Sequence, residues 1–592
     1  MRLGIPVGRS AGHQDAQGTS DAVLRRAEVS DPDLPAWRRS LWHVLAHEND
    51  REPRGLGGTP LAVTSLVEPA ALALVKLVLA LVAATMVGAE VLGRRRERRT
   101  ERVLAVCAVL ATAAYFAPAI ARGGLVHRWE MFHYYLGSKY QPELGYERLY
   151  ACVTEVDMGD GIRNARTRRV RDLRTDVLVT GGQAVERAGS CEAALGGERF
   201  AAFQADVRTF RHVVGSRARW EPMFEDHGYN PPPLWTLVGR TLASLHAATL
   251  GYLTLLASLD VVLMAGTIAL LAWGFGRRVA LLGAIFWGTQ APADFSWVGG
   301  GFLRQDWLFC AVAGVALLRR GRPALAGAAL VTAALLRLFP AVLLFGLGVS
   351  VLAASLRRHA LTGEQRRLLG GALATLLVLV GASTLALGLD SYAAFWEHIQ
   401  LRTGAITNHM GLRTLFAYAP NASVEQLANH ELLDPAAPWA SARALRLAGL
   451  DLAYRATAAL VLGVVAFTAF RVRSAWLAVS LSLPLVPALT EPSCYYYSVW
   501  LLALPLARAR PAVGVTLLGV AAAGELIVLQ VRAYDVRYFE LALLYVGSML
   551  VMLISFTDSP RARFVAWRRR KTAAGRSILP VSTGSLHSGR TL

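Results

Sequence analysis

The sequence has little charge, few cysteines and almost no lysine, and it lacks motifs that mark several common protein classes. Only 18% of its 592 residues are charged, whereas soluble proteins carry about 25%. Its 5 cysteines form no CxxC pair, and neither a GxxxxGK[ST] phosphate loop nor an HExxH motif occurs. These absences exclude a P-loop ATPase engine, a paired-cysteine zinc site and a zincin-type metalloprotease.

The chain has instead a series of apolar runs of roughly membrane-spanning length. Hydrophobic residues make up 54% of the sequence, and the runs recur along most of it, as is typical of a polytopic membrane protein. The net charge of +20 comes mostly from arginines that punctuate these runs. Because such punctuation is a topology signal, we expect the lipid bilayer as a partner and no nucleic acid.

The alternation of polar and apolar segments predicts the domain organisation. In order, the chain has a polar N-terminal tail that we expect to be disordered (1–62), a first pair of membrane helices (63–121), a large extracytoplasmic loop domain (122–236), a polytopic membrane domain with an outward loop (237–558, loop 389–449) and a basic cytoplasmic tail (559–592). The predicted fold is an all-α polytopic membrane protein with roughly 11–13 transmembrane helices and one mixed extracytoplasmic loop domain.

Some predicted spans, such as 475–489 and 497–508, are shorter than the roughly 20 residues that a straight span needs. Either their bounds differ by a few residues, or the helices are short or broken at a buried cavity.

The basic residues predict the orientation of the spans. Arginines cluster in alternate connections, and positive residues stay on the cytoplasmic side. The loop domain and the outward loop are therefore predicted to face away from the cytoplasm, whereas the side of the N-terminal tail stays open. The connections concerned include Arg277, Arg319, Arg357, Arg471 and Arg508.

An acidic residue stands in an aromatic setting just after the second span. The segment reads His127-Arg-Trp-Glu-Met-Phe-His-Tyr-Tyr-Leu-Gly-Ser-Lys-Tyr140, and it places Glu130 between two histidines. An interfacial aromatic belt accounts for the aromatic residues, but it does not need the carboxylate. Apolar surroundings raise the pKa of a carboxyl group and suit it to general-base chemistry. Glu130 is therefore the candidate catalytic residue.

Three further segments resemble those of a known family. They are the outward turn Gly301-Phe-Leu-Arg-Gln-Asp-Trp307, the stretch from Arg319 to Leu335-Leu-Arg-Leu-Phe-Pro340, and the proline-rich Tyr229-Asn-Pro-Pro-Pro-Leu-Trp235. Together with the early acidic residue Glu130, they make residues 103–556 resemble the GT-C superfamily of integral-membrane glycosyltransferases. Within it, the chain is similar to bacterial polyprenyl-phosphate-mannose-dependent mannosyltransferases.

This resemblance implies a multi-pass protein of the bacterial cell membrane (inner or plasma). It would transfer a hexose or pentose from a polyprenyl-phosphate donor to an extracytoplasmic glycolipid, glycan or protein acceptor, with inversion at the anomeric carbon. Glu130 would take the proton of the acceptor hydroxyl. The paired acidic motif of the family is absent because Glu130 stands alone, which leaves open whether a divalent metal ion takes part. No other cofactor is expected.

The leaving phosphate needs cationic groups, which arginine supplies with bidentate geometry. Arg337 is the first candidate, because it interrupts the apolar run 323–356 near its outward turn. A charge in such a run is costly and points to a functional site, although snorkelling to the headgroups is the alternative. Further donor-phosphate candidates lie on outward connections: Arg304, Arg402, His409 and Arg413.

Other outward residues are candidates for binding the acceptor or a sugar. Asp226 and His227 precede three prolines and either line an acceptor cleft or cap a turn. Tyr495 lies in an aromatic turn and either stacks on a sugar or belongs to the interfacial belt. The whole set is His133, Tyr134, Asp226, His227, Gln305, Asp306 and Tyr495.

Cys152 and Cys191 share the predicted extracytoplasmic domain, where an oxidising environment would allow a disulfide. The sequence does not give their distance, so a bridge and two free thiols both stay open.

Two functions of other classes also fit this composition. A transporter or flippase of lipid-linked sugars would be expected to show an internal repeat, and none is visible. A non-catalytic envelope assembly factor would use its outward domain to bind a partner.

Overall fold

The computed structural model describes residues 69–94, 97–401, 404 and 406–557. All of them belong to one compact unit, Ser65–Leu592. The predicted tails 1–62 and 559–592 lie outside the described residues.

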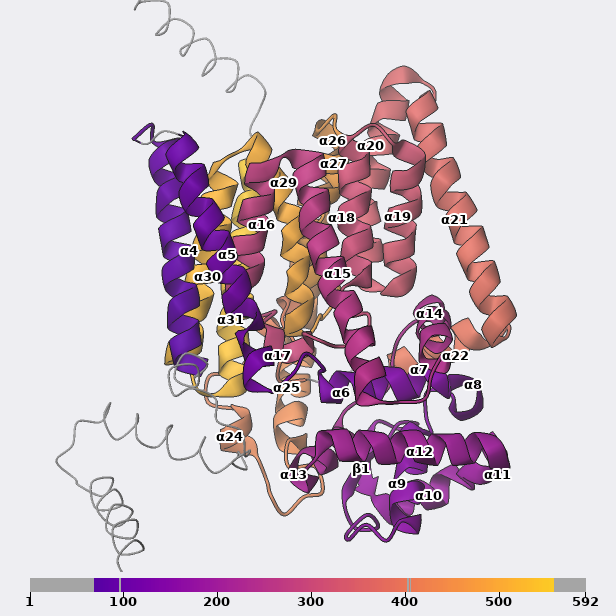
Figure 1. Cartoon of the computed structure of the whole chain (residues 1–592). Coiled ribbons are helices and arrows are strands. Elements are labelled where there is room, and N and C mark those ends of the chain that lie inside the picture. The colour runs from indigo at the N-terminus through magenta and orange to yellow at the C-terminus, as the bar shows by residue number, and fades with distance from the viewer. Residues whose placement is uncertain (1–68, 95–96, 402–403, 405, 558–592) are drawn as a thin grey trace, which may run out of the picture. The chain divides into compact units, whose positions relative to one another are not determined.

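The described chain is mainly a bundle of apolar helices (Figure 1). A helix of about 20 residues spans the roughly 30 Å of a bilayer's hydrocarbon core, and 8 of the described helical segments are long and apolar enough to do so. The chain is therefore an α-helical polytopic membrane protein. These segments are α4 (Pro69–Val91), α5 (Glu97–Ala121), α15 (Leu250–Phe275), η3 with α20 (Phe339–Arg358), α21 (Gly363–Leu387), α26 (Asp451–Arg471), α30 (Ala512–Gln530) and α31 (Tyr534–Ser555).

Shorter apolar helices pack among these segments. They are α16 (Arg277–Thr289), α18 (Asp306–Arg319), α19 (Pro323–Leu336), α27 (Ala475–Ser480), α28 (Leu485–Leu489), η4 (Cys494–Ala503) and α29 (Leu504–Ala509). Among the closest packings are those of α4 with α30, of α16 with α5, and of α19 with both α18 and α21.

The segments predicted as spans 475–489 and 497–508 are broken. The first is divided into α27 and α28 by a turn before Pro484, and the second is a 3-10 helix, η4, followed by α29 with Pro505 in its first turn. Proline cannot donate the backbone hydrogen bond that would continue a helix. Both pieces are nevertheless largely buried, as suits irregular backbone that is covered by protein at membrane depth.

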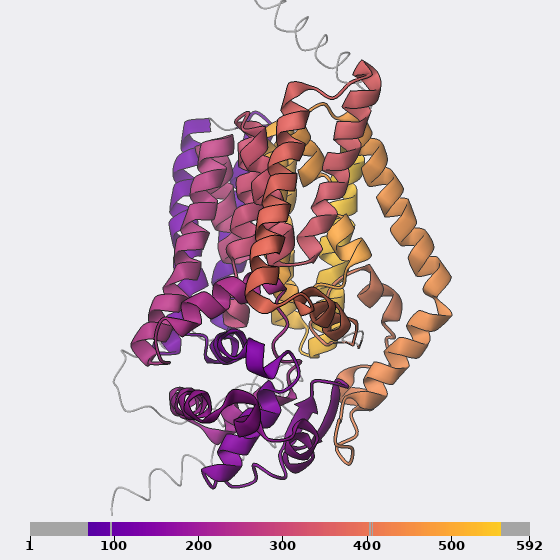
Figure 2. The same cartoon turned by 90° about the vertical axis from the view of Figure 1, so that its right-hand side faces the viewer.

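Arginines gather at one end of the bundle, where they bind the ends of neighbouring helices. Arg278 pairs with Glu90, and Nε of Arg320 donates to the carbonyl oxygen of Trp273 at 2.7 Å. Figures 1 and 2 show the elements α9–α13 beyond the opposite end. The arginine-rich connections and the large polar region thus lie at opposite ends of the membrane bundle.

The polar region between α5 and α15 is folded around aromatic residues. Phe132 packs against Trp220 and Phe224, with ring centroids 5.2 and 5.9 Å apart. Two short strands, β1 (Arg169–Asp172) and β2 (Val177–Thr180), pair as an antiparallel hairpin. The helices are α6 (Arg128–Met131), η1 (Phe132–Leu136), α7 (Gly137–Lys139), α8 (Gln141–Leu144), α9 (Leu149–Gly159), α10 (Gly181–Ala188), α11 (Cys191–Leu195), α12 (Gly197–Val214), α13 (Arg217–Trp220), η2 (Glu221–Glu225) and α14 (Pro233–Ser244).

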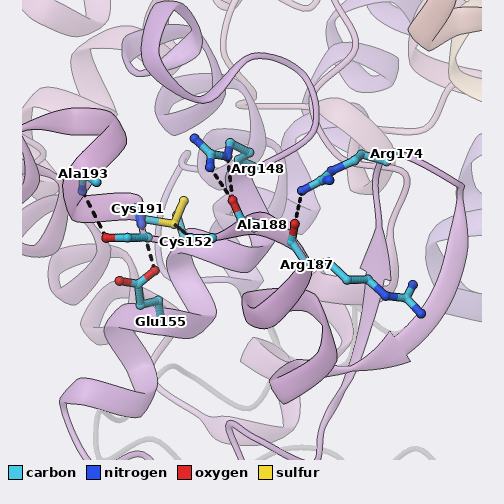
Figure 3. Close-up of a disulfide and its surroundings, with 10 residues drawn as sticks. Arg148, Cys152, Glu155, Arg174, Arg187, Ala188, Cys191 and Ala193 are labelled. Atoms are coloured by element: carbon cyan, nitrogen blue, oxygen red, sulfur yellow. Dashed lines mark hydrogen bonds between the residues drawn. A yellow bond between two sulfur atoms is a disulfide. The ribbon is translucent and has the colours of Figure 1, made fainter.

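A disulfide joins Cys152 on α9 to Cys191 at the start of α11, with the two Cα atoms 5.5 Å apart (Figure 3). Glu155, one turn further along α9, accepts a hydrogen bond from the backbone N–H of Cys191 at 3.1 Å. Two contacts therefore tie α11 to the same face of α9.

The second polar segment, between α21 and α26, is also helical where it is described. It contains α22 (Ser391–Gln400), α23 (Leu412–Ala417), α24 (Val424–Leu427) and α25 (Ala437–Gly449). α23 packs against α25 and α31, so this segment returns to the bundle and contributes to the site described next.

Candidate functional site

Glu130 is held rigidly at the junction between the membrane bundle and the polar region. His127 caps α6, because its Nδ1 accepts the backbone N–H of Glu130 at 3.3 Å, and its Nε2 donates to the carbonyl oxygen of Ser296 at 2.9 Å. Burial, and next the positive charge of Arg122, lower the pKa of His127 to about 4. The ring is therefore neutral at physiological pH, as these one-donor, one-acceptor contacts require.

The carboxylate of Glu130 meets the guanidinium of Arg304. Nε of Arg304 lies 2.9 Å from Oε2 of Glu130; the Arg304 side chain is 2% exposed and that of Glu130 is 13% exposed. The guanidinium also lies over the rings of Tyr134 and Tyr495, at 4.2 and 5.1 Å from their centroids. Burial raises the pKa of Glu130, Arg304 and His133 oppose that rise, and the pKa stays above its ordinary value. This direction suits a group that accepts a proton near neutral pH.

A membrane helix positions Arg304 from behind. The carboxylate of Asp260 on α15 accepts the backbone N–H groups of Arg304 and Gln305, both at 3.1 Å. Asp306 follows at the start of α18 and accepts the N–H of Trp307 at 2.7 Å. Gln305 and Asp306 are buried, and they do not line the cavity described below.

Glu130 opens onto a cavity of about 960 Å³. Its wall is built from α6, the segment before α14, the segment around Ser296, the α19–η3 junction, α22, and the turns around Asn408 and Glu491. Several residues that the sequence singled out meet there although they come from distant segments: Glu130, Asp226, His227, Arg337, His409 and Tyr495.

Arg337 stands on this wall as the C-cap of α19, where Pro340 follows within a 3-10 turn. The residue is 5% exposed. Its Nη1 donates to the carbonyl oxygen of Leu336 at 2.9 Å, whereas Nε and Nη2 are buried without a hydrogen-bond partner. Buried polar groups are normally hydrogen-bonded, so these two nitrogen atoms remain able to donate hydrogen bonds to an acceptor.

Asp226 and His227 form a second polar cluster on the wall. Trp129 donates its indole N–H to Asp226 at 2.6 Å, and the backbone N–H of His227 donates to the same carboxylate at 2.6 Å. Burial works to raise the pKa of Asp226, but His133 and His227 outweigh it, so the pKa is lowered. Nδ1 of His227 lies 2.7 Å from the carboxylate of Asp176 in the β1–β2 turn.

His133 and Tyr134 lie behind the wall and support it. His133 contacts the carbonyl oxygen of Trp129 through Nδ1 at 2.8 Å and the hydroxyl of Tyr150 through Nε2 at 2.6 Å. The hydroxyl of Tyr134 donates to Asn230, a lining residue, at 3.2 Å. These hydrogen bonds position residues that line the cavity, and the two side chains themselves do not face a ligand.

The other predicted phosphate ligands differ from Arg337 in their charge or their partners. Burial, followed by the nearby cations, lowers the pKa of His409 to about 3, so the neutral ring supplies no positive charge. Arg413 does not line the cavity, and its Nε lies 3.6 Å from Glu491. Arg304 is paired with Glu130. Arg402 lies outside the described residues.

Sequence reasoning missed three groups of this site. Asp260 could have been noticed as a lone acid in the apolar helix α15, by the same criterion that selected Arg337. Glu491 and Asn408 line the cavity, but Asn408 carries no signal in the sequence. Asn408 is brought there by its carbonyl oxygen, which accepts the N–H of Cys494 at 2.9 Å.

No protein-family model, curated protein or solved structure matches the chain. Within the part of the chain that the structure describes, no group of three or more histidine, cysteine or acidic side chains is arranged to hold a metal ion.

Proposed function

We propose that the chain is a membrane glycosyltransferase that moves a sugar from a polyprenyl-phosphate donor to an extracytoplasmic glycolipid, glycan or protein acceptor. The observation that carries the proposal is Arg337. Its buried guanidinium faces a large cavity with two nitrogen atoms unsatisfied, and a phosphate oxygen is among the partners that guanidinium N–H groups bind strongly.

The position of Arg337 supports a lipid-linked phosphate. It stands between the apolar helices α19 and α20, so a bound phosphate would lie next to the membrane interior. A polyprenyl phosphate has both features that this position calls for, an anionic headgroup and an apolar chain.

Glu130 supplies the base in this proposal. Its carboxyl group lines the cavity with Arg337, and its raised pKa favours proton transfer from an acceptor hydroxyl. That hydroxyl would attack the anomeric carbon opposite the phosphate and invert its configuration, while Arg337 stabilises the departing phosphate.

The location also belongs to the proposal. Arginines at one end of the bundle support a cytoplasmic position for that end, by the positive-inside rule. The loop domain 122–236, the loop 389–449 and the cavity then face outward from a bacterial inner or plasma membrane. With α16, α18, α19 and the broken segments crossing as well, the number of membrane helices reaches the roughly 11–13 expected from the sequence.

The test uses the purified full chain in lipid nanodiscs with radiolabelled polyprenyl-phosphate mannose and polyprenyl-phosphate glucose. We expect donor binding and release of the sugar from its phosphate. Arg337→Ala should weaken donor binding and lower turnover, and Arg337→Lys should recover only part, because a point charge cannot reproduce the guanidinium fork. The control is Arg319→Ala, an exposed arginine at the other end of the bundle.

Two outcomes would contradict the proposal. If the donor binds Arg337→Ala as tightly as the wild type, Arg337 does not bind the phosphate. Donor that binds but is moved across the bilayer intact would favour the transporter instead.

A further inference from the structure

One residue of the β1–β2 hairpin contacts a residue that lines the cavity. Asp176 occupies the hairpin turn with a left-handed backbone (φ 58°), and Nη1 of Arg171 donates to its carbonyl oxygen at 2.8 Å. From this turn its carboxylate meets Nδ1 of His227 at 2.7 Å, across 51 residues of sequence. The hairpin is thus built to present a carboxylate to a cavity-lining histidine.

This contact determines which nitrogen of His227 carries hydrogen. A carboxylate only accepts hydrogen bonds, so Nδ1 is the donor toward Asp176. In the neutral ring Nε2 is then left with a lone pair. The backbone N–H of His227 donates to Asp226, Asp176 holds the ring through Nδ1, and His227 lines the cavity, so in its neutral form the ring offers Nε2 as an acceptor there.

Asn408 offers a second acceptor on the same cavity. The residue is 8% exposed, it lines the cavity, and its Oδ1 has no hydrogen-bond partner. Nδ1 of the neighbouring His409 is likewise unpartnered, and that ring is neutral because its pKa is about 3. His227 and His409 both line this cavity.

The charges around this cluster disfavour an anion. Asp226 has a lowered pKa and is ionised, and Glu225 and Glu491 also line the cavity. Arg413 lies beside Glu491 and limits the attraction for a cation. The unpartnered Oδ1 of Asn408 is a neutral acceptor, and such an oxygen accepts a hydrogen bond from a hydroxyl group. Trp297 and Tyr495 on the same cavity, with ring centroids 6.3 Å apart, add flat surfaces against which a pyranose ring can pack.

We infer that His227, Asn408 and His409 form the acceptor subsite and that the acceptor is an uncharged sugar whose hydroxyls donate to Nε2 of His227 and Oδ1 of Asn408. The assignment of this cluster as an acceptor subsite rests on the proposed function. Asp176 is a positioning residue, because it acts on the ligand only through His227.

The first experiment measures equilibrium binding of tritiated octyl α-D-mannopyranoside to the full chain in phosphatidylcholine–phosphatidylglycerol nanodiscs, which contain no competing sugar. Asp176→Asn and Asn408→Ala should each weaken binding about tenfold, the value of one buried hydrogen bond. The matched control is Asp172→Asn, which removes another hairpin carboxylate, one that binds Arg187. It should stay within about twofold of wild type.

The second experiment reads the histidine directly. In ¹⁵N-histidine-labelled protein, His227, assigned from the signal lost in His227→Gln, should be the Nδ1–H tautomer in the wild type and in Asp172→Asn. It should lose that preference in Asp176→Asn. Asp172→Asn changes the same hairpin but keeps the Asp176 carboxylate. A tautomer change confined to Asp176→Asn therefore separates the positioning of His227 from a loss of hairpin stability.

The results decide between this inference and the proposed function. An Nε2–H tautomer in the wild type, unchanged octyl mannoside affinity in Asp176→Asn, or octylamine binding better than the mannoside would overturn the acceptor subsite. Octyl mannoside binding that depends on Asp176 without any binding of polyprenyl-phosphate donors would preserve the sugar site and overturn the glycosyltransferase proposal alone.

Discussion

Nε of Arg304 lies 2.9 Å from Oε2 of Glu130. This contact joins α6 to the turn before α18. The pair keeps the carboxylate at one place on the cavity wall. It also opposes the effect of burial on the pKa of Glu130, so Arg304 affects both where this carboxylate stands and when it is ionised.

The pH dependence of transfer follows from this pair. A base works only when deprotonated, so activity should fall as the pH drops through the pKa of Glu130, with a midpoint above the ordinary 4.5. Arg304→Ala removes the cation that favours the carboxylate and should move this midpoint to higher pH. Glu130→Gln should abolish the limb and lower the rate about 10²–10⁴-fold. Rates against pH for purified protein give both quantities.

The control for this measurement is Glu147→Gln. Glu147 is an exposed carboxylate 3.5 Å from Arg174, and its loss should leave the acidic limb in place. If Glu130→Gln turns over at the wild-type rate, the base is another group.

A buried ion pair inside the bundle should contribute strongly to stability. Lys76 on α4, 2% exposed, pairs with Asp294 at the start of the segment that carries Ser296 and Trp297. Lys76→Met leaves that carboxylate without its partner and should lower the free energy of unfolding by about 3 kcal/mol. Thermal unfolding in detergent measures the effect.

A double-mutant cycle with Asp294→Asn tests the pairing itself. The double variant should lose less stability than the two single variants together, and strict additivity would show that the residues act independently. The more exposed pair of Glu90 and Arg278 is the comparison. Glu90→Gln should cost no more than about 1 kcal/mol.

The disulfide closes a loop with a sequence separation of 39 residues, for which the chain-entropy model gives about 4 kcal/mol. Mass spectrometry of denatured protein should show two additional alkylation tags only after reduction. Replacing Cys152 and Cys191 together with alanine should lower the unfolding temperature without changing octyl mannoside affinity at low temperature. Complete labelling before reduction would show that no bridge forms.

The orientation can be measured with single cysteines at exposed positions. Ala193→Cys on α11 and Ser441→Cys on α25 should react with a membrane-impermeant maleimide in intact cells. Ala360→Cys, next to the arginine-rich end of α20, should react only after the cells are opened. Labelling of Ala360→Cys in intact cells would reverse the proposed topology.

The membrane character of the chain could be predicted because it depends on local composition. Runs of apolar residues the length of a bilayer have few other uses, and the helices α4, α5, α15 and α21 follow them closely. The helix breaks at Pro484 and Pro505 were harder to place, because a short apolar run does not reveal whether it is one helix or two.

The contacts of the site were predictable only in part. Glu130 and Arg337 stand out because charge in an apolar setting is costly wherever it occurs. The pairing of Glu130 with Arg304 and of His227 with Asp176 depends on how distant segments fold together, and one sequence carries no record of that. Asn408 shows the limit most clearly, since an asparagine in a polar loop is unremarkable until its neighbours are known.

The length of α19 has a consequence for how a ligand is encountered. The helix has 14 residues and is about 21 Å long, shorter than the roughly 30 Å of the hydrocarbon layer, and Arg337 ends it. A lipid headgroup drawn to this guanidinium would arrive by lateral diffusion within the leaflet. Occupancy of the site would then follow the mole fraction of that lipid in the bilayer, and diluting the membranes in buffer would leave it unchanged.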